Sequence, residues 1–292
     1  MPAVTDPRYE NIIAYQGQPG AYSHLACRQV FAEMTALACG TFVEAMERVE
    51  RGQAKLAMIP LDNSTAGRVE EIYRQMPKTR LHIIGEHFEP VNHCLLGLKG
   101  SRLEQLTSVG SHPQALAQCA DQIRTLGLDP VAMFDTAGAA MTLNERQDPR
   151  CAAIASSLAA ELYGLDILQT EMQDIDGNTT RFLILSKTCR MPAYQPDRRY
   201  ITSLIFKGRN IPAALYKCMG GFATNNLNLL KLESYMAGGT LKDCSFHLDV
   251  AGHPDQRPMQ LALQELEFFA LDIRNLGTYE AHPFRTDHAL IA

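Results

Sequence analysis

Residues 174–185 read DIDGNTTRFLIL, a polar loop followed at once by a short apolar run. The run at 182–185 is typical of a short buried strand. Two threonines and an arginine therefore stand at the mouth of a strand. Threonine favours strands, and arginine often ends one at a protein edge, so the pattern has a purely structural interpretation. The alternative is that the strand end directs these side chains into a cleft, and the rest of the chain has to decide.

The composition fits a globular enzyme of two domains, or of one domain with a smaller module. The chain has 292 residues, 46% of them hydrophobic and 20% charged, so it can bury a substantial core. Its apolar runs fall short of the ~18 residues that a membrane span needs, and the N-terminus shows no signal-peptide pattern. We therefore expect a cytoplasmic protein without a membrane partner. The net charge of −5 gives no general attraction to nucleic acid.

Cysteine and histidine spacings do not favour a metal site. The eight cysteines include no CxxC pair, so we expect reduced and mostly buried thiols. The nine histidines show no HExxH or similar ligand spacing. We expect no metal.

The first part of the chain alternates strand-like and helix-like segments. Strands are predicted at 12–15, 55–61 and 151–156. Helices are predicted from the apolar stripe at 69–76, from Ser111-His112-Pro113 onward with its face Leu116, Cys119, Ala120 and Ile123, and at 157–163 before Gly164. This alternation predicts a parallel β/α construction.

Residues 187–199 interrupt the pattern with two prolines and several basic residues, and we interpret them as a linker. Beyond them the order is strand, helix, strand, strand, helix, strand. The second helix is read from an apolar stripe that runs from Met259 to Ile273, and a short strand LGTY (276–279) follows it. This order predicts a ferredoxin-like βαββαβ module of about 80 residues.

Polar side chains gather where β/α folds build binding sites, beyond strand ends and at helix starts. The stretches are 16–26, 60–71, 110–119, 134–140 and 174–181. Ser, Thr, Asn and Asp before a helix are caps more often than ligand groups, and Ser64 and Thr136 fit either role. The glycine-rich first stretch matches neither the dinucleotide nor the phosphate-loop fingerprint. Pattern alone therefore predicts a β/α protein with a polar small-molecule cleft and no cofactor.

Taken together, these stretches resemble prephenate dehydratase in the form that carries a C-terminal ACT domain. The resemblance runs from about Ile12 to Phe284. Its landmarks, in order, are QGQPGAYSHLA (16–26), IPLDNSTAGRV (59–69), SHPQALAQC (111–119), TAGAA (136–140), AAIASSLAAELYGL (152–165), NTTRF (178–182) and LESYM (232–236). Each landmark alone is weak evidence for the family, whereas seven landmarks in the right order and spacing are strong evidence.

The resemblance implies an α/β fold with a two-lobed catalytic domain, similar to a type II periplasmic binding protein, and a ferredoxin-like ACT domain. The implied domains are a catalytic domain at 10–188 (lobe one about 12–90 plus 180–188, lobe two about 91–175), a linker at 189–199 and the ACT domain at 200–279. Two segments cross between the lobes, near 89–96 and 171–182. Thr180 and Arg181 are thus expected on the hinge side of the cleft.

The implied reaction is that of a hydro-lyase, which converts prephenate to phenylpyruvate, carbon dioxide and water. Prephenate has two carboxylates and a ring hydroxyl, and loss of one carboxylate with the hydroxide makes the ring aromatic. The reaction needs no metal, redox cofactor or covalent nucleophile. The protein has to hold a dianion and help hydroxide to leave.

The resemblance also assigns roles to residues. Arg181 suits carboxylate binding, because its planar donors match that group. Thr180 is expected to donate a hydrogen bond to the charge that develops on the leaving hydroxyl. Asn63 and Ser64 match the family's Asn-Ser pair, which completes the expected catalytic set. Further candidates for substrate binding are Ser23, Thr136, Ser111, His112, Gln114 and Phe182.

Two of these assignments carry an open question. Phe182 also suits core packing, because it points the other way along the strand. The family usually has Glu before Asn-Ser, whereas this chain has Asp62, which is one methylene shorter. If that carboxylate orients the pair its reach is altered, and if it caps a helix Asp serves as well.

The C-terminal domain is expected to bind phenylalanine, the pathway end product, as a feedback inhibitor at a subunit interface. The matching positions are Pro212, Ala213, Ala214, Leu215, Asn225, Leu227, Glu233 and Ser234. The family commonly has Gly where Ala213 stands and Arg-Pro where this chain has Tyr235-Met236. The alternative is a domain that only dimerises the protein. We expect a homodimer or a homotetramer.

Two other functions remain open at this point. Arogenate differs from prephenate by an amino group in place of the keto group, and the sequence does not separate an arogenate dehydratase from a prephenate dehydratase. A non-catalytic amino-acid sensor with the same two modules would keep the cleft without needing Thr180.

Overall fold

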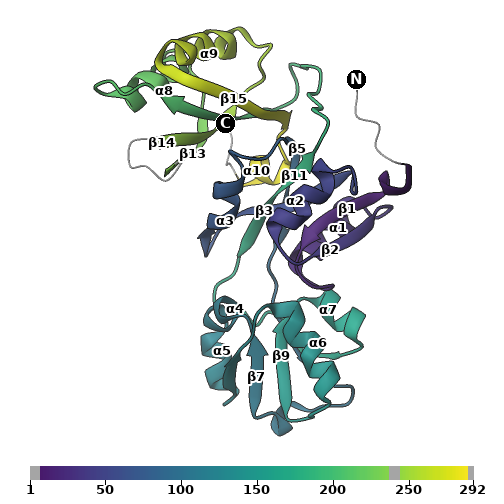
Figure 1. Cartoon of the computed structure of the whole chain (residues 1–292). Coiled ribbons are helices and arrows are strands. Elements are labelled where there is room, and N and C mark those ends of the chain that lie inside the picture. Colours follow the sequence, from purple (N-terminus) through teal and green to yellow (C-terminus); the bar gives the residue numbers. More distant parts are fainter. Residues whose placement is uncertain (1–6, 237–243, 289–292) are drawn as a thin grey trace. The chain divides into compact units, whose positions relative to one another are not determined.

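The computed structural model describes residues 7–236 and 244–288, which form three sheets flanked by helices (Figure 1). Packing divides the chain into two units. The first consists of Met1–Val69 and Phe88–Phe182, and the second of Glu70–His87 and Leu183–Ala292. The division falls inside two strands of one sheet and not at the predicted linker, so part of the expected lobe one packs with the C-terminal residues.

The first sheet has the strand order β2-β1-β3-β11-β5, with β4 paired to β3. Its strands are β1 (Ile12–Gln16), β2 (Thr35–Cys39), β3 (Leu56–Asn63), β4 (Gly67–Arg68), β5 (His82–Pro90) and β11 (Thr179–Ser186), and the helices beside them in sequence are η1 (Pro7–Tyr9), α1 (Tyr22–Val30), α2 (Phe42–Glu50) and α3 (Glu70–Gln75). The pairing of β1 with β2 and β3 is parallel, as predicted, whereas β4 pairs with β3 antiparallel.

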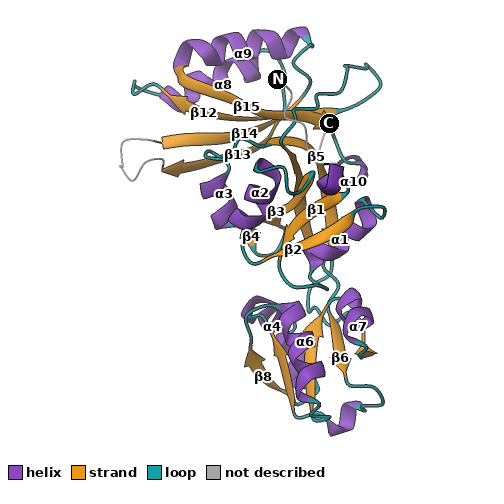
Figure 2. Ribbon diagram, turned by 45° about the vertical axis from the view of Figure 1, so that its right-hand side comes forward, coloured by secondary structure: helices purple, strands orange, loops and turns teal. Residues whose placement is uncertain are grey.

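The second sheet has the order β10-β6-β9-β7-β8. It comprises β6 (Cys94–Gly97), β7 (Ser108–Ser111), β8 (Asp129–Ala132), β9 (Cys151–Ala155) and β10 (Asp166–Gln169), with η2 (Leu103–Gln105), α4 (Pro113–Gln118), α5 (Ala120–Thr125), α6 (Thr136–Arg146) and α7 (Ser157–Tyr163). Helices flank this sheet (Figure 2). Helix α7 ends at Gly164 as predicted, in a left-handed conformation. The single helix predicted after Pro113 is wrong, because the chain breaks at Cys119 into α4 and α5.

Residues 200–280 form a C-terminal module with the predicted βαββαβ order. It contains β12 (Tyr200–Gly208), α8 (Ala214–Thr224), β13 (Leu229–Met236), β14 (Cys244–Ala251), α9 (Arg257–Phe269) and β15 (Ala270–Glu280), and α10 (Pro283–Asp287) follows it. The sheet order is β13-β14-β12-β15, and α8 and α9 lie side by side on one face (Figure 1).

One predicted helix boundary in this module is wrong. Ile273 was expected on the second helix, but α9 ends at Phe269 and Ile273 lies opposite Phe206 in the β15–β12 pairing. The apolar stripe continues across the boundary because Ile273 packs against the same core as α9. Strand β15 therefore extends well beyond the predicted LGTY segment.

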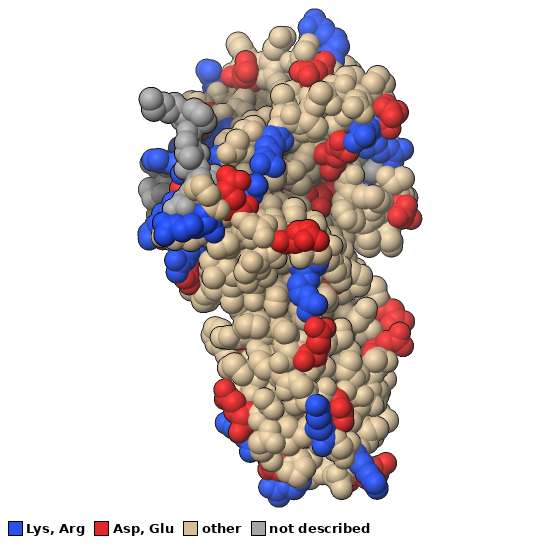
Figure 3. Space-filling model, turned by 90° about the vertical axis from the view of Figure 1, so that its right-hand side faces the viewer, with Lys and Arg blue, Asp and Glu red and all other residues tan. Residues whose placement is uncertain are grey.

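Charged side chains of both signs are mixed on the face that Figure 3 draws. Lysine and arginine lie beside aspartate and glutamate over much of this face. Mixed signs keep the long-range field of this face weak. An anion that binds here would depend on a few local groups.

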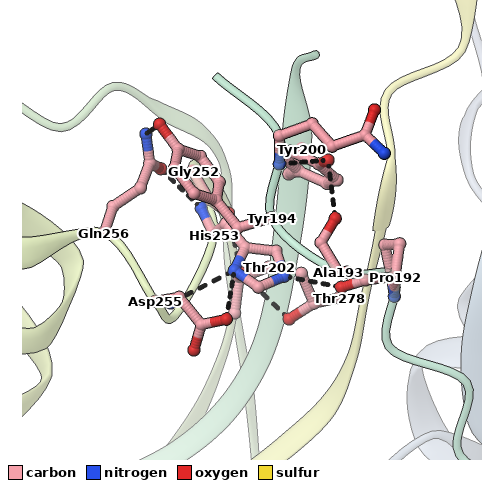
Figure 4. Close-up of polar contacts among 11 residues, drawn as sticks. Pro192, Ala193, Tyr194, Tyr200, Thr202, Gly252, His253, Asp255, Gln256 and Thr278 are labelled. Atoms are coloured by element: carbon pink, nitrogen blue, oxygen red, sulfur yellow. Dashed lines mark hydrogen bonds and ion pairs between the residues drawn. The ribbon is translucent and has the colours of Figure 1, made fainter. Parts of the chain in front are cut away.

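The predicted linker contains no helix or strand at 187–199, yet it is hydrogen-bonded to the C-terminal module (Figure 4). The fully buried His253 donates from Nε2 to the Pro192 carbonyl at 2.9 Å. The Tyr200 hydroxyl donates to the Ala193 carbonyl and accepts from the Gln195 amide, both at 3.0 Å. The linker is therefore fastened to the module along part of its length.

Within the second unit, residues 70–87 are joined to the C-terminal residues by polar and backbone contacts. Arg274 donates to the Leu81 carbonyl at 3.2 Å. Gly277 lies so close to the backbone at Ile83 that a Cβ atom there would be 1.9 Å from the Ile83 oxygen. These contacts explain why the segment packs with the C-terminal module.

A buried ion pair makes a further connection in this unit. Arg285, on α10, donates from Nε and Nη2 to the two carboxylate oxygens of Glu86, on β5, at 2.6 and 2.9 Å. The Glu86 side chain has no exposed surface and that of Arg285 is 7% exposed. A bidentate pair in this setting stabilises the fold chiefly because removing one partner leaves a buried charge.

We expect Arg285→Ala to lower the free energy of unfolding by about 3 kcal/mol, measured by urea denaturation. Arg51→Ala is the control, because Arg51 pairs with Glu47 one helical turn away and both side chains are exposed; its effect should stay below about 0.5 kcal/mol. Equal effects of the two substitutions would contradict this interpretation of the buried pair.

Candidate functional site

The first unit contains a cleft of about 390 Å³, a volume in the range of small-molecule sites. Its lining combines residues that follow strands of both sheets. The polar lining residues are Tyr22, Ser23, Asn63, Arg68, His93, His112, Gln114, Gln118, Asp135, Thr136, Asn178 and Thr180. The apolar ones are Pro60, Ala66, Gly67, Val69, Val91, Ala115 and Phe182.

Strand β11 presents alternate residues to this cleft. Thr180 and Phe182 both line it, so the expectation that Phe182 points the other way is wrong, because residues two apart on a strand share a face. Arg181 is not among the lining residues. Successive side chains of a strand point to opposite faces, so one strand cannot aim both Thr180 and Arg181 at the same ligand. The Arg181 side chain is 7% exposed, and its Nη1 lies 3.7 Å from Oδ2 of Asp62 on β3. In this geometry Arg181 ties two strands together and does not clamp a ligand in the cleft.

The carboxamide of Asn63 has a fixed orientation. Its Oδ1 accepts hydrogen bonds from the backbone amides of Thr65 and Ala66, at 3.1 and 2.8 Å. Backbone amides can only donate, so the oxygen must face them. The Nδ2 group then donates to Oδ1 of Asn178 at 2.7 Å and to Oγ1 of Thr180 at 3.0 Å.

This orientation determines what the Thr180 hydroxyl can do. Its oxygen accepts the hydrogen bond from Asn63, and among the described residues no acceptor takes its own hydrogen. A hydroxyl has one hydrogen to donate. Thr180 therefore has a hydrogen available for a ligand in the cleft.

The two segments that connect the sheets of this unit are hydrogen-bonded to each other. The Val91 amide donates to the Asn178 carbonyl at 2.8 Å, and the Met172 amide donates to the His93 carbonyl at 2.9 Å. The His93 amide also donates to Oε1 of Gln173 at 3.0 Å. The segments lie where the sequence predicts the two crossings, and they bring His93 and Asn178 to the cleft.

The other predicted site residues divide between the cleft and the interior. Ser23, Thr136, His112 and Gln114 line the cleft with Asn63, Thr180 and Phe182. Ser111 is fully buried and donates to the Ile154 carbonyl at 2.7 Å. Ser64 accepts from the Thr179 amide at 2.9 Å. Neither Ser111 nor Ser64 is among the lining residues.

Six polar lining residues were absent from the predicted set. They are Tyr22, Arg68, His93, Gln118, Asp135 and Asn178. Five of them stand inside the stretches quoted for the family resemblance or, for His93, in the predicted first crossing. Asp135 directly precedes such a stretch and accepts from the Gly138 amide as the cap of α6. Their positions in these stretches could have marked them as candidate cleft residues. The sequence does not show the directions of their side chains.

The glycine-rich stretch at 16–26 packs against the second sheet's helices. Ser156 donates to the Gly20 carbonyl, and the Tyr163 hydroxyl donates to the Pro19 carbonyl at 2.7 Å. Gly20 has a φ of +94°, and a Cβ atom there would lie 2.9 Å from Cα of Ala159. Glycine at position 20 is therefore required by both conformation and contact, and the loop closes one side of the cleft.

The ionisable groups of the lining differ in their environments. Burial lowers the pKa of His93 below its ordinary value, against a smaller opposing effect of its hydrogen bond to Gln118. Burial also raises the pKa of the Tyr22 phenol well above its ordinary value, so the phenol stays protonated. Among the described lining residues, Arg68 is the one lysine or arginine. The cleft thus combines one permanent cation, the carboxyl group of Asp135 and uncharged hydrogen-bonding groups.

In residues 7–236 and 244–288, no group of three or more His, Cys, Asp and Glu side chains is placed to hold a metal ion. In the same residues no helix is long and apolar enough to cross a membrane.

Comparisons with known proteins agree with this geometry. A family model described as prephenate dehydratase matches residues 13–190, more than half of the chain. A bifunctional N-acyl-homoserine lactone acylase/prephenate dehydratase of Komagataeibacter europaeus is 48% identical, and the match covers 94% of this chain and 98% of that protein. The chloroplastic arogenate dehydratase/prephenate dehydratase 1 of Arabidopsis thaliana is 38% identical, over 91% of this chain and 71% of that protein.

A solved structure of prephenate dehydratase from Arthrobacter aurescens in complex with L-Phe has a TM-score of 0.85 to this chain. The two chains are 28% identical, and the match covers 95% of this chain and 97% of the other. The similarity therefore extends over both the cleft and the C-terminal module.

Proposed function

The chain belongs to the prephenate dehydratase family, and we propose that it converts prephenate to phenylpyruvate in phenylalanine biosynthesis. The family activity is that of a hydro-lyase. In the reaction the bond from the ring to the departing carboxylate breaks, and its electron pair enters the ring. The ring carbon–oxygen bond breaks at the same time, and its pair leaves with the oxygen. The dianion thereby gives carbon dioxide, hydroxide and the phenylpyruvate anion, and the hydroxide takes up one proton from the buffered solution to become water.

The observation that carries this proposal is the available hydrogen on Thr180. Negative charge grows on the ring oxygen as it leaves, and a positioned donor stabilises that charge more than it stabilises the neutral hydroxyl. Asn63 occupies the acceptor side of Thr180, at 3.0 Å from its oxygen, so the hydrogen is left for the substrate. Thr180 is thus a hydrogen-bond donor to the leaving group, and full proton transfer is not required.

Carboxylate binding falls to Arg68 in this proposal. Arg68 lines the cleft, whereas Arg181 is directed away from it and pairs with Asp62. Asp62 stands where the family usually has Glu and is one methylene shorter. The distance from its Oδ2 to Nη1 of Arg181 is 3.7 Å, which is longer than in a close ion pair. Arg181 then connects β11 to β3. The predicted role of binding a substrate carboxylate passes from Arg181 to Arg68, at the end of β4.

We expect the protein to form phenylpyruvate from prephenate, and Thr180→Val to lower kcat about 10²- to 10³-fold with little change in KM. Valine keeps the shape of threonine and removes the hydroxyl. Phenylpyruvate absorbance measures the rate. Thr179→Val is the matched control, because the Thr179 hydroxyl donates to the Gly177 carbonyl and Thr179 does not line the cleft. The kcat of this variant should stay within about threefold of the kcat of the unsubstituted protein.

Arg68→Ala tests the binding half of the same mechanism. It should raise KM about tenfold and leave kcat within about threefold, the pattern of an interaction made in both ground and transition state. If Thr180→Val retains normal kcat, the donor role is wrong. If the original chain turns over arogenate and not prephenate, the substrate is arogenate, and if it turns over neither, a non-catalytic sensor becomes the better interpretation.

The C-terminal module is the proposed ACT domain, with phenylalanine as effector. The related structure in complex with L-Phe supports this choice. Of the predicted positions, Ala213 precedes α8 and has φ 56° and ψ 34°, a left-handed conformation. This conformation costs a residue with a Cβ about 1 kcal/mol relative to glycine. The glycine common in the family at this position would adopt it freely.

We expect L-phenylalanine to inhibit the enzyme and to raise its melting temperature, with a stabilisation of about 2.7 kcal/mol at one hundred times the dissociation constant. Ala213→Gly should raise the stability of the free protein by up to about 1 kcal/mol and keep or strengthen the response. Differential scanning fluorimetry with L-lysine as the control ligand measures both effects. If millimolar phenylalanine raised the melting temperature of neither the unsubstituted protein nor Ala213→Gly, dimerisation would be the one role left for the module.

The relative named as an acylase suggests a second activity. At 48% identity over nearly the whole of both chains, this chain is a candidate for hydrolysis of an N-acyl-homoserine lactone. Water would add to the amide carbonyl and the carbon–nitrogen bond would break, giving a fatty acid and homoserine lactone. The apolar lining, including Val69, Val91 and Phe182, is suited to an acyl chain.

We expect release of homoserine lactone from N-acyl-homoserine lactones, measured by chromatography. Thr180→Val decides whether the two activities share the cleft: loss of both activities places the acyl chain there, and loss of the dehydratase alone places it elsewhere. Absence of product with acyl chains of four to twelve carbons would restrict this activity to the relative.

A further inference from the structure

A continuous set of hydrogen bonds runs from Thr180 through the cleft wall to a buried histidine. Asn63 donates to both Thr180 and Asn178. Nδ2 of Asn178 lies 3.3 Å from Oε1 of Gln118, and the same oxygen lies 3.1 Å from Nε2 of His93. All these residues belong to the first unit and line the cleft. None of the roles assigned above uses Gln118 or His93.

The direction of each hydrogen bond in this set follows from the one before. Oδ1 of Asn178 accepts from Asn63, so its Nδ2 faces Gln118 and must donate to it. Oε1 of Gln118 is then an acceptor, and an acceptor can only meet a nitrogen of His93 that carries hydrogen. The Nε2 atom of His93 is therefore protonated. The geometry thus fixes the tautomer of His93 through the backbone amides that hold Asn63.

The other side of the His93 ring is also occupied. The Tyr22 hydroxyl lies 3.0 Å from Nδ1 of His93 and 2.8 Å from the Asn92 carbonyl, and the two rings meet edge to face. His93 is 2% exposed. Burial disfavours the charged ring. In a neutral ring with hydrogen on Nε2, Nδ1 is an acceptor that competes with the Asn92 carbonyl for the single hydrogen of the Tyr22 hydroxyl.

A buried histidine with two partners could serve packing alone. Two features of His93 argue against a role in packing alone. Its Nε2 reaches an oxygen that is shared with Asn178, and Asn178 has 6% exposure and a direct partner in Asn63. If His93 stopped donating, Gln118 could rotate its amide, and Asn178 would lose the acceptor that keeps its own oxygen toward Asn63.

We propose that His93, with Tyr22 behind it, is a positioning residue for the dehydratase reaction: it fixes Gln118 and Asn178 so that Asn63 donates to Thr180 and the Thr180 hydrogen points to the substrate. The inference rests on the proposed role of Thr180. It assigns to His93 no contact with the substrate and no transfer of a proton. Misplacement of a catalytic group by about 1 Å can lower a rate about 10²-fold.

Kinetics of His93 variants test this role. His93→Phe keeps a ring and removes both hydrogen bonds, and we expect kcat to fall about 10- to 100-fold with KM within about threefold. His93→Gln, which restores a donor toward Gln118, should recover most of that loss. In the Thr180→Val background, His93→Phe should change kcat less than about twofold, because the set of hydrogen bonds has lost its end point. Full additivity of the two substitutions would overturn the proposal.

A measurement independent of activity separates this inference from the proposed function. Imidazole nitrogen shifts in NMR spectra should show His93 neutral at pH 7, with hydrogen on Nε2 and none on Nδ1. Hydrogen on Nδ1 alone would overturn the inference even in an active enzyme. If the original chain turns over neither prephenate nor arogenate, the proposed function fails, and the positioning role fails with it even where the tautomer is as expected.

Discussion

The two-residue period of β11 is the constraint on which the site depends. It sends Thr180 and Phe182 to the cleft and Arg181 to the opposite face, where Arg181 lies 3.7 Å from Asp62. One strand thus places a hydroxyl at the cleft and a cation in the protein interior.

The Asn63 carboxamide fixes the hydrogen bonding of the Thr180 hydroxyl. Two backbone amides fix its oxygen, and its nitrogen then has to donate to Thr180 and Asn178. Rigid donors that are oriented before the substrate arrives require no reorganisation as charge develops, which is the usual source of electrostatic catalysis. The residues hydrogen-bonded in this set come from the ends of β3 and α4 and from the two crossing segments, so the set forms only where the sheets of this unit meet.

Much of the fold was predictable because its signals are local. Alternating strands and helices, the left-handed Gly164 and the βαββαβ order of residues 200–280 all followed from periodicity and capping. Errors arose where a longer-range contact overrode the local pattern. Ile273 carries the helical stripe but pairs with Phe206 in a sheet, and Cys119 interrupts a stripe that is regular on both sides. The packing of 70–87 with the C-terminal residues depends on contacts such as that between Gly277 and Ile83, which no local pattern contains.

The sequence by itself determined the family, the βαββαβ order of the C-terminal module and the set of stretches that meet at the cleft, because motifs, periodicity and caps depend on neighbouring residues. Only the tertiary structure decided that Ser111 and Arg181 face the interior, and that His93 and Asn178 line the cleft. The reason is that a side chain's partner depends on strand register and on hydrogen-bond direction. Asn63 and Asn178 are 115 positions apart, and their contact exists only once both crossings are in place.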